Sequence, residues 1–432
     1  MNSVASLKKQ LESGALHPVY PQLYGSKFDT KIIDKRYHNL IEKHQELFYD
    51  YKAAEGPLHL FSTAGRSELA GNHTDHNLGK VIAATINLDT IGAVRKTNDN
   101  LVVLVSEGFP AVKVDITSLA VRDEEQNTTD ALLRGIANAF VQRGLKVGGW
   151  IANTTTNVLK GSGLSSSAAI EVLCATIFNN LYNDDVLSPV ELAIIGKYAE
   201  NVYFGKPSGL MDQVACAQGG IVGIDFGVPD TPVLTPIDFA FTDHGYGIVI
   251  VDTKGNHADL TPDYAAAPME MKMVANFFGK PVLREISFDE FEAALPELRE
   301  KLRNDRALLR AYHFLTENER VTQMLEALQK KDVEGYLRLV RESGDSSYKF
   351  LQNLYSSKHP AEQGLPLAIA MTERFLAGAG ACRVHGGGFA GTIQAYIPLT
   401  RLDDYRMKMD RIFGVGSATT ISVRSRRTSC IL

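Results

Sequence analysis

The sequence predicts an α+β protein with two domains, in which mixed sheets combine with helices. Its 432 residues exceed the usual size of one domain, about 100–200 residues, so two domains or a large fused pair are expected. Strand-like and helix-like segments mix along the chain without an internal repeat or a low-complexity tract. Hydrophobic residues make up 44% of the chain, which is ample for buried cores.

The expected N-terminal domain, residues 1–228, contains both kinds of element. Residues 81–118 are rich in strand formers, with the strongest run at 102–105, and residues 150–158 form another strand-like run. Apolar spacing and capping signals then predict helices. These are residues 129–143, the segment that carries Ile170, Leu173, Ile177 and Leu181, and a segment that begins with the capping box at Ser188 and ends near Tyr203.

The expected C-terminal domain, residues 229–432, begins within a proline-rich polar connection between two strand-like runs, 221–226 and 246–252. Residues 263–376 are mainly helical, and a long charged stretch there carries an apolar stripe typical of core packing. The stripe is Leu308, Leu309, Tyr312 and Leu315. The remaining predicted elements are strand 391–397, helix 402–413 and strand 419–423.

Charge and composition exclude several classes of function. The 45 basic and 50 acidic residues give a net charge of −5, so we expect no nucleic-acid partner, and the basic cluster at residues 424–427 is interpreted as a solvated tail. The chain has no run of 18 apolar residues and no apolar N-terminal core, so neither a membrane span nor a signal peptide is expected. The four cysteines lack metal-ligand spacing, and three are expected to be buried thiols, which fits a reducing cytoplasm. The oligomeric state is open, with a monomer favoured.

A glycine- and serine-rich segment lies between a predicted strand and a predicted helix. Free N–H groups and the positive end of the helix dipole point together at such a position, which suits a phosphate group, and glycine allows close approach. Taken alone, such a turn is more often a plain helix cap than a nucleotide-binding site. The segment is also not a Walker loop. It consists of Lys160, Gly161, Ser162, Gly163, Leu164, Ser165, Ser166, Ser167 and Ala168.

Two further segments indicate what function this glycine- and serine-rich segment has. Residues 64–79 contain Gly71-Asn72-His73-Thr74-Asp75-His76, and residues 384–391 contain Gly386-Gly387-Gly388. In their order and separation the three segments resemble the three motifs of the GHMP small-molecule kinases, and the first is similar to the galactokinase signature. The resemblance covers about residues 55 to 425 and implies the two-domain GHMP kinase fold, with the active site between the domains.

The resemblance implies ATP-dependent phosphorylation of a sugar at its 1-hydroxyl, with galactose as the expected sugar. ATP would bind at residues 160–167 together with Gly387 and Gly388. Mg²⁺ would be held by Ser167 and Glu200, which suits an ion that takes a few hard oxygens besides phosphates and waters. Without the resemblance, Glu200 would be interpreted as a solvated charge at a helix end.

Asp212 and Arg66 are the catalytic residues that the resemblance implies. Phosphoryl transfer requires an oriented acceptor hydroxyl and neutralised phosphate charge. Asp212 matches an aspartate that faces the sugar hydroxyl, and Arg66 matches an arginine that pairs with it. Because an arginine lowers the pKa of a neighbouring carboxylate, Asp212 is expected to orient the hydroxyl more than it abstracts its proton. Taken alone, Asp212 would be interpreted as a helix cap and Arg66 as a surface charge.

The sugar is expected to contact Asn72, His73, Asp75, Gly209 and Tyr264, again by resemblance. Two alternatives stand beside this reading: the His73 region as a metal site, and Tyr264 as a core residue.

Some positions depart from the galactokinase pattern. Glutamate is usual where this chain has Asn72, and binds the sugar 6-hydroxyl there; asparagine is usual where it has Glu68. Two other functions therefore remain open: a kinase of a related sugar such as a uronic acid, and a non-catalytic sugar sensor on the same fold.

Overall fold

The computed structural model describes residues 4–159, 163–206, 208–228, 231–255 and 260–432, with Glu55 described by its backbone alone. Its largest element is a mixed sheet in the order β12-β1-β2-β5-β3-β4, in which β6 pairs with the free end of β2 and β7 pairs with β6. The β3–β5 pair is parallel and the other pairs are antiparallel. The strands are β1 (Ala54–Ala70), β2 (Lys80–Thr97), β3 (Leu101–Ser106), β4 (Val112–Asp115), β5 (Trp150–Thr156), β6 (Ile221–Asp225), β7 (Val233–Ile237) and β12 (Ser429–Cys430).

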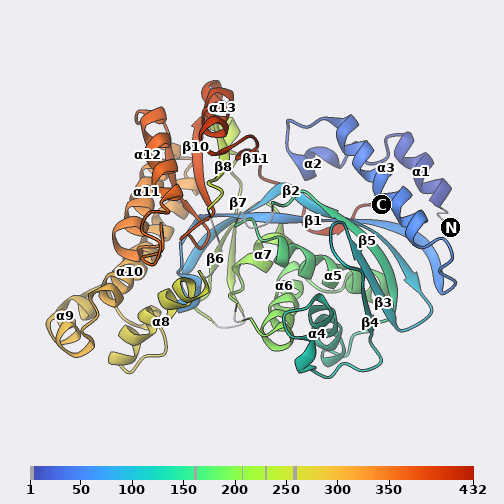
Figure 1. The fold of residues 1–432 in the computed structure, drawn as a ribbon, viewed down its shortest axis with the longest axis horizontal. Coiled ribbons are helices and arrows are strands. Elements are labelled where there is room, and N and C mark those ends of the chain that lie inside the picture. The colour runs from blue at the N-terminus through green and yellow to red at the C-terminus, as the bar shows by residue number, and fades with distance from the viewer. Residues whose placement is uncertain (1–3, 160–162, 207, 229–230, 256–259) are drawn as a thin grey trace.

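Helices cover both faces of this sheet (Figure 1). One face carries α1 (Val4–Glu12), α2 (Tyr20–Tyr24) and α3 (Thr30–Leu47), whose apolar side chains pack with Leu58, Leu60 and Ile91 of the sheet. The opposite face is covered by four helices, and the second motif leads into one of them, α5 (Ser166–Asn183). The other three are α4 (Thr129–Gln142), α6 (Pro189–Tyr198) and α7 (Met211–Gln218).

A smaller antiparallel sheet, in the order β11-β8-β10-β9, organises the other part of the chain. Its strands are β8 (Tyr246–Asp252), β9 (Ala381–His385), β10 (Thr392–Pro398) and β11 (Ala418–Ile421). The helices around it are α8 (Thr261–Phe277), α9 (Phe288–Leu302), α10 (Asp305–Gln329), α11 (Val333–Ser346), α12 (Gly364–Leu376) and α13 (Leu402–Phe413). A shared apolar core joins the two sheets through Leu69, Ile82, Ile250, Leu328 and Tyr396, and no helix in the described part of the chain is long and apolar enough to cross a membrane.

The α+β class and many predicted elements are confirmed. Helix α4 begins at the predicted residue, helix α6 begins after Ser188 with the capping box formed, and β8 and α13 have the predicted bounds. These elements were predictable because caps and apolar spacing act within a few residues.

Distant contacts add features that the sequence did not predict, and in one case they contradict the prediction. The polar connection contains β7, which pairs with β6, so the larger sheet extends beyond residue 228, and a domain boundary there stays a prediction. The predicted stripe of α10 does pack in a core, through Leu308, Tyr312 and Leu315, and the helix also buries the polar residues Arg310, His313 and Glu317. Arg424 is not solvated: it is 0% exposed and donates to Ser62 Oγ at 2.7 Å.

Candidate functional site

Arg66 and Asp212 form the centre of the site. Arg66 lies near the end of β1 and is buried, and Asp212 lies in the first turn of α7. The Nε and Nη2 atoms of Arg66 donate to Oδ1 of Asp212 at 2.8 and 2.6 Å, and Nη1 donates to the carbonyl of Gly163. The Ser165 hydroxyl donates to Oδ2 of Asp212. Strand β1, the second motif and α7 therefore meet at one pair of charges, with a donor on each oxygen of Asp212.

Electrostatics keep Asp212 ionised. Burial by itself raises the pKa of Asp212, but the Arg66 guanidinium, the Ser165 hydroxyl and the Lys206 ammonium together hold that pKa below its usual value. The side chain is 35% exposed, so it can meet a ligand. A carboxylate of low pKa is a weak base, and it is better suited to orient a hydroxyl group than to remove its proton early.

A cavity of about 210 Å³ opens in front of this pair. Sequence-predicted residues line it from several parts of the fold: the end of β1 and the segment after it, the start of α5, the η3 turn (Ala199–Phe204), the start of α7 with the turn before it, and the segment after β9. They are Arg66, His73, Asp75, Ser167, Glu200, Gly209, Asp212 and Gly387. The fold therefore brings most of the predicted catalytic, sugar and metal residues to one cavity between the two sheets.

The second motif surrounds the start of α5. Lys160, Gly161 and Ser162 lie outside the described residues. Leu164 is buried in the core between the sheets, and its carbonyl accepts from the Arg66 N–H at 3.1 Å. Ser165 precedes α5 in a left-handed conformation, Ser166 is the first residue of the helix, and Ser167 is exposed to the cavity.

The third motif lies against the second. A Cβ atom at Gly386 would lie 3.6 Å from Cα of Gly163, so the two glycine loops are neighbours. The Gly387 carbonyl accepts from Nε2 of His73 at 3.0 Å. Gly388 has a φ of 78°, and a Cβ atom there would lie 2.1 Å from the Asn353 carbonyl oxygen. Glycine is thus required at residue 388 for conformation and for space.

The sugar-motif residues His73 and Asp75 face the cavity. His73 is held by its hydrogen bond to Gly387, and burial lowers the pKa of His73 to about 4, with a further lowering from His76, so the ring is neutral at pH 7. Asp75 accepts from the His76 N–H at 3.0 Å. A Cβ atom at Gly209 would lie 2.1 Å from Oδ2 of Asp75, so any larger residue there would displace that carboxylate.

Asn72 does not lie where the sequence suggested. It is 0% exposed, and its Nδ2 donates to Oε1 of Glu68 at 3.2 Å and to the Gly386 carbonyl at 2.6 Å. Its Oδ1 accepts from Nδ2 of Asn353 at 2.8 Å. With these groups taken up by the protein, Asn72 has no amide hydrogen left for a sugar, and the expectation that it contacts the substrate is not supported by this geometry.

Tyr264 also differs from expectation. Its hydroxyl donates to the Gly388 carbonyl at 2.9 Å, its ring packs edge-on against Phe389 at 5.3 Å between centroids, and it does not line the cavity. Burial raises the pKa of Tyr264, and Asp263 adds to this. These contacts favour the alternative that Tyr264 is a packing residue, and the segment that it packs against is the third motif.

Glu200 lies in a π-helical turn, η3 (Ala199–Phe204), that continues α6. It is buried, and its Oε1 accepts from Nζ of Lys206 at 2.7 Å while its Oε2 accepts from Nε2 of Gln213 at 2.9 Å. Lys206, Gln213 and Glu68 also line the cavity, and sequence reasoning missed all three as site residues. The signal for Lys206 and Gln213 was their place beside Asp212 in one short segment.

Glu68 shares the strand and the buried surroundings of Arg66. Burial raises the pKa of Glu68 above its usual value, and the guanidinium groups of Arg383 and Arg66 act in the opposite direction. Nη2 of Arg383 donates to Oε1 of Glu68 at 3.0 Å. Two of the departures from the galactokinase pattern, at residues 68 and 72, are thus in direct contact.

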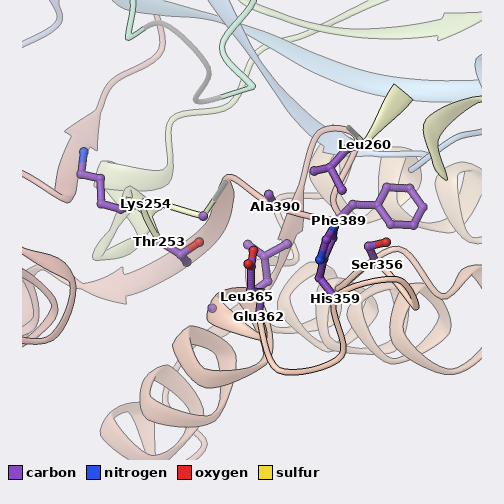
Figure 2. A pocket seen from close by; sticks show the side chains of 11 residues that line it. Thr253, Lys254, Leu260, Ser356, His359, Glu362, Leu365, Phe389 and Ala390 are labelled. Atoms are coloured by element: carbon purple, nitrogen blue, oxygen red, sulfur yellow. The ribbon is translucent and has the colours of Figure 1, made fainter. Parts of the chain in front are cut away.

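A second cavity, of about 330 Å³, lies on the other side of the third motif, where Phe389 and Ala390 line it (Figure 2). Its other walls come from the end of β8 and from residues 356–365, including His359 and Glu362. None of the residues predicted for catalysis lines this cavity, so its larger volume does not make it the better candidate for the reaction.

Comparison with known families gives two matches. The model of the GHMP kinases N terminal domain matches residues 131–220, which contain the second motif, Glu200 and Asp212. The galactokinase galactose-binding signature matches residues 42–96, which contain Arg66 and the first motif.

Among characterised relatives, the galactokinase of Clostridium tetani (strain Massachusetts / E88) is 31% identical over 379 residues, which cover 86% of this chain and 91% of that protein. The galactokinase of Actinobacillus pleuropneumoniae serotype 3 (strain JL03) is 29% identical over 364 residues, 83% and 89% of the two chains. The structure of Lactococcus lactis galactokinase complexed with galactose superimposes with a TM-score of 0.75 at 23% identity, covering 90% and 98% of the chains. The GHMP kinase fold expected from the sequence is thereby confirmed.

Proposed function

The chain belongs to the galactokinase family of GHMP kinases, and we propose that it transfers the terminal phosphoryl group of ATP to the 1-hydroxyl of galactose. GHMP kinases take the phosphoryl group from ATP, so the chain is an ATP-dependent sugar kinase. The observation that carries the specific proposal is the contact of Arg66 with both Asp212 and the Gly163 carbonyl. It joins the hydroxyl-orienting group to the phosphate loop.

Asp212 orients the acceptor hydroxyl in this proposal, and Arg66 offsets the charge of the phosphoryl group in transfer. Such preorganised charges supply most of the catalysis that phosphoryl transfer needs. The sugar lies between Asp212 and the side chains of His73 and Asp75, where the neutral His73 ring and the oxygens of Asp75 offer partners to ring hydroxyls. Gly209 leaves the space for Asp75. The ATP phosphates lie against the start of α5 and the loop of Gly387 and Gly388.

Mg²⁺ is part of this proposal, with Ser167 and Glu200 as the protein groups that hold it. Both side chains line the cavity, and both offer hard oxygen atoms. Among the described residues each Glu200 oxygen has one hydrogen-bond donor, and a carboxylate oxygen can accept more than one interaction. The site thus retains capacity for a cation, which would neutralise phosphate charge when bound.

The proposed compartment is the cytoplasm. The four cysteines are free, and Cys174, Cys216 and Cys382 are buried. Free thiols are typical of a reducing compartment.

ADP release tests the function directly. The purified protein is incubated with galactose, ATP and Mg²⁺, and each component is omitted in turn. We expect ADP release only with all three present, and a product in which phosphate is bound to carbon 1, identified by ³¹P NMR. ADP release that does not depend on the sugar, or a phosphate on another carbon, would contradict the proposal.

A further inference from the structure

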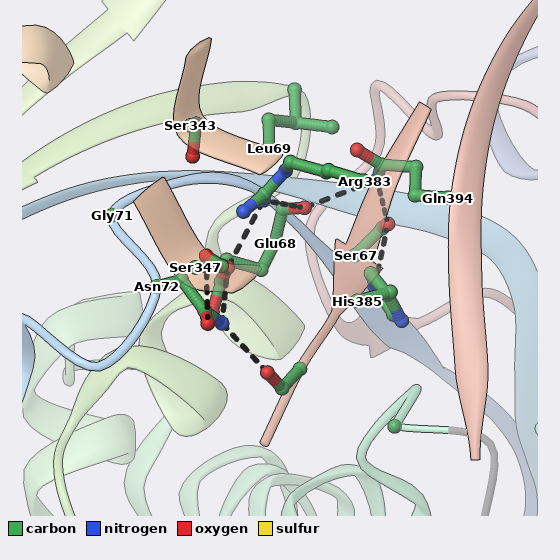
Figure 3. A network of polar contacts seen from close by, with 12 residues as sticks. Ser67, Glu68, Leu69, Gly71, Asn72, Ser343, Ser347, Arg383, His385 and Gln394 are labelled. Atoms are coloured by element: carbon green, nitrogen blue, oxygen red, sulfur yellow. Dashed lines mark hydrogen bonds and ion pairs between the residues drawn. The ribbon is translucent and has the colours of Figure 1, made fainter. Parts of the chain in front are cut away.

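One carboxylate of the cavity has no role in the proposal above. Asp212 is engaged by Arg66 and Ser165, and Glu200 by Lys206 and Gln213. Glu68 is different, because only one of its oxygens is engaged. Its Oε1 accepts from Asn72 at 3.2 Å and from Arg383 at 3.0 Å, while Oε2 has no hydrogen-bond donor among the described residues (Figure 3).

The free oxygen reaches the cavity. Glu68 is 3% exposed and lines the cavity beside His73 and Gly387. The buried side-chain oxygens that lack a partner include Oε1 of Glu171, but they do not include Oε2 of Glu68. Oε2 therefore has no hydrogen-bond partner among the described residues and is not fully buried, so it is the atom of Glu68 that a ligand in the cavity can contact.

The contacts of Glu68 fix its direction. Arg383 is 0% exposed and holds both the backbone carbonyl and Oε1 of Glu68. Asn72 holds Oε1 from the other side, and Asn72 is itself fixed by Gly386 and Asn353. An acceptor held in this way loses little freedom when a ligand binds. Asn72 is therefore a positioning residue for Glu68.

The position of Glu68 along β1 indicates which part of a ligand it meets. Arg66 and Glu68 are separated by one residue in a regular part of the β1–β2 ladder, so their side chains lie on the same face, about 6.6 Å apart along the strand. Arg66 marks the transfer end of the cavity. Glu68 lies two residues further along the strand, a separation comparable to the distance between hydroxyl groups on opposite sides of a pyranose sugar.

We propose that Oε2 of Glu68 accepts a hydrogen bond from a hydroxyl group of the sugar remote from the phosphorylated carbon, and that its charge selects neutral sugars against sugar acids. The inference rests on the proposed function in taking a sugar as the ligand of this cavity. The presence of Asn72 suggested that the chain has no carboxylate to bind the remote end of the sugar. In this proposal that carboxylate is present, at residue 68. A uronic acid would bring a second negative charge to that carboxylate.

Binding without ATP tests this inference, with galactose and galacturonate as ligands in titration calorimetry. We expect the wild-type protein to bind galactose about tenfold or more tightly than galacturonate, and Glu68→Gln to reduce this preference by about tenfold or more. Glu317→Gln is the matched control: Glu317 is a second buried glutamate close to Arg383, it does not line the cavity, and its variant should keep the wild-type preference. An unchanged preference in folded Glu68→Gln overturns the inference, as does a wild-type protein that binds neither sugar or prefers the acid.

Glu68→Gln leaves Arg383 without its counter-charge, so thermal unfolding of each variant is recorded first. If Glu68→Gln does not fold, wild-type protein with 4-deoxygalactose and 6-deoxygalactose decides. One of the two should bind about tenfold or more weakly than galactose, since a hydrogen bond to a charged group is lost, and equal binding of all three sugars overturns the inference.

Selective binding without phosphoryl transfer would contradict the proposed function and leave this inference standing. Phosphoryl transfer to galactose, together with an unchanged preference of Glu68→Gln for galactose over galacturonate, would support the proposed function and overturn this inference.

Discussion

At the scale of single residues, Asp212 combines a lowered pKa with three hydrogen-bond donors. Two come from Arg66 and one from Ser165. The geometry is set before substrate binds, which avoids reorganisation during the reaction. The same donors make Asp212 a weak base, so its contribution depends on its charge and its position.

Asp212→Asn is expected to reduce kcat to less than about a tenth of the wild-type value, a loss of more than about 1.4 kcal/mol. Asparagine has a similar shape but no charge, and its amide group would face donors from Arg66 or Ser165. Steady-state kinetics measure the loss, and thermal unfolding checks that the variant is folded. Asp225→Asn, a change at a carboxylate that pairs with Arg284 outside the cavity, should retain the wild-type kcat. A folded Asp212→Asn protein that keeps more than about a tenth of the wild-type kcat would show that the charge of Asp212 is not required.

At the scale of elements, Gln213 of α7 links the π-helical turn η3 to α5 and brings two glutamates together behind the cavity. Nε2 of Gln213 donates to Oε2 of Glu171 at 3.0 Å and to Oε2 of Glu200 at 2.9 Å. Glu171 is 1% exposed, and its Oε1 is buried without a partner among the described residues. Burial, and then the charge of Glu200, raise the pKa of Glu171 to about 8.

This shift predicts a pH dependence of stability. Between the usual glutamate pKa of 4.5 and about 8, folded Glu171 holds a proton that the unfolded chain has released. The free energy of unfolding of the wild-type protein therefore falls as pH rises through this window, by at most about 1.4 kcal/mol per pH unit from this group.

Glu171→Gln removes the titrating group, so its stability relative to wild type should rise from pH 5 to pH 8 and then level off. Urea unfolding at several pH values, without ATP or metal, measures the difference. Parallel pH profiles for the two proteins would show that Glu171 titrates normally.

At the scale of the whole molecule, the two ends of the chain are tied to one buried charge in the larger sheet. Asp89 accepts from Nη1 of Arg36 at 2.5 Å and from the hydroxyls of Tyr24 and Ser62 at 3.0 and 2.6 Å, and Nη1 of Arg424 lies 3.7 Å from its Oδ2. Strand β12 adds to β1, and Ile431 packs with the N-terminal helices. The last residues thus complete the larger sheet, although the smaller sheet precedes them in the sequence.

Arg424→Met should therefore destabilise the fold without changing the site. Removing one partner of a buried charged network costs about 3–5 kcal/mol, while the cavity lies elsewhere. Chemical unfolding should show this loss, and kcat at a temperature where the variant is folded should match the wild type. Arg427→Met, a change at a neighbouring exposed arginine, should leave stability nearly unchanged. Equal effects of the two substitutions would contradict a structural role for Arg424.

The sequence by itself determined the family, the three motifs, the elements with clear caps and periodicity, and the residues Arg66, His73, Asp75, Ser167, Glu200, Gly209 and Asp212 that the cavity brings together. Their roles in binding and catalysis stay predictions. Such features are local or have a fixed order along the chain, so neighbouring residues are enough to indicate them.

Only the tertiary structure decided which polar side chains line the cavity. Asn72 is held away from the cavity by Gly386 and Asn353, and Glu68 is held at the cavity wall by Arg383; these partners are more than 280 positions away in the sequence. The same holds for Arg424, which looks like a surface charge until Asp89 is placed beside it. A buried polar group must find its partners wherever the packed chain supplies them, and no periodicity along the chain encodes that choice.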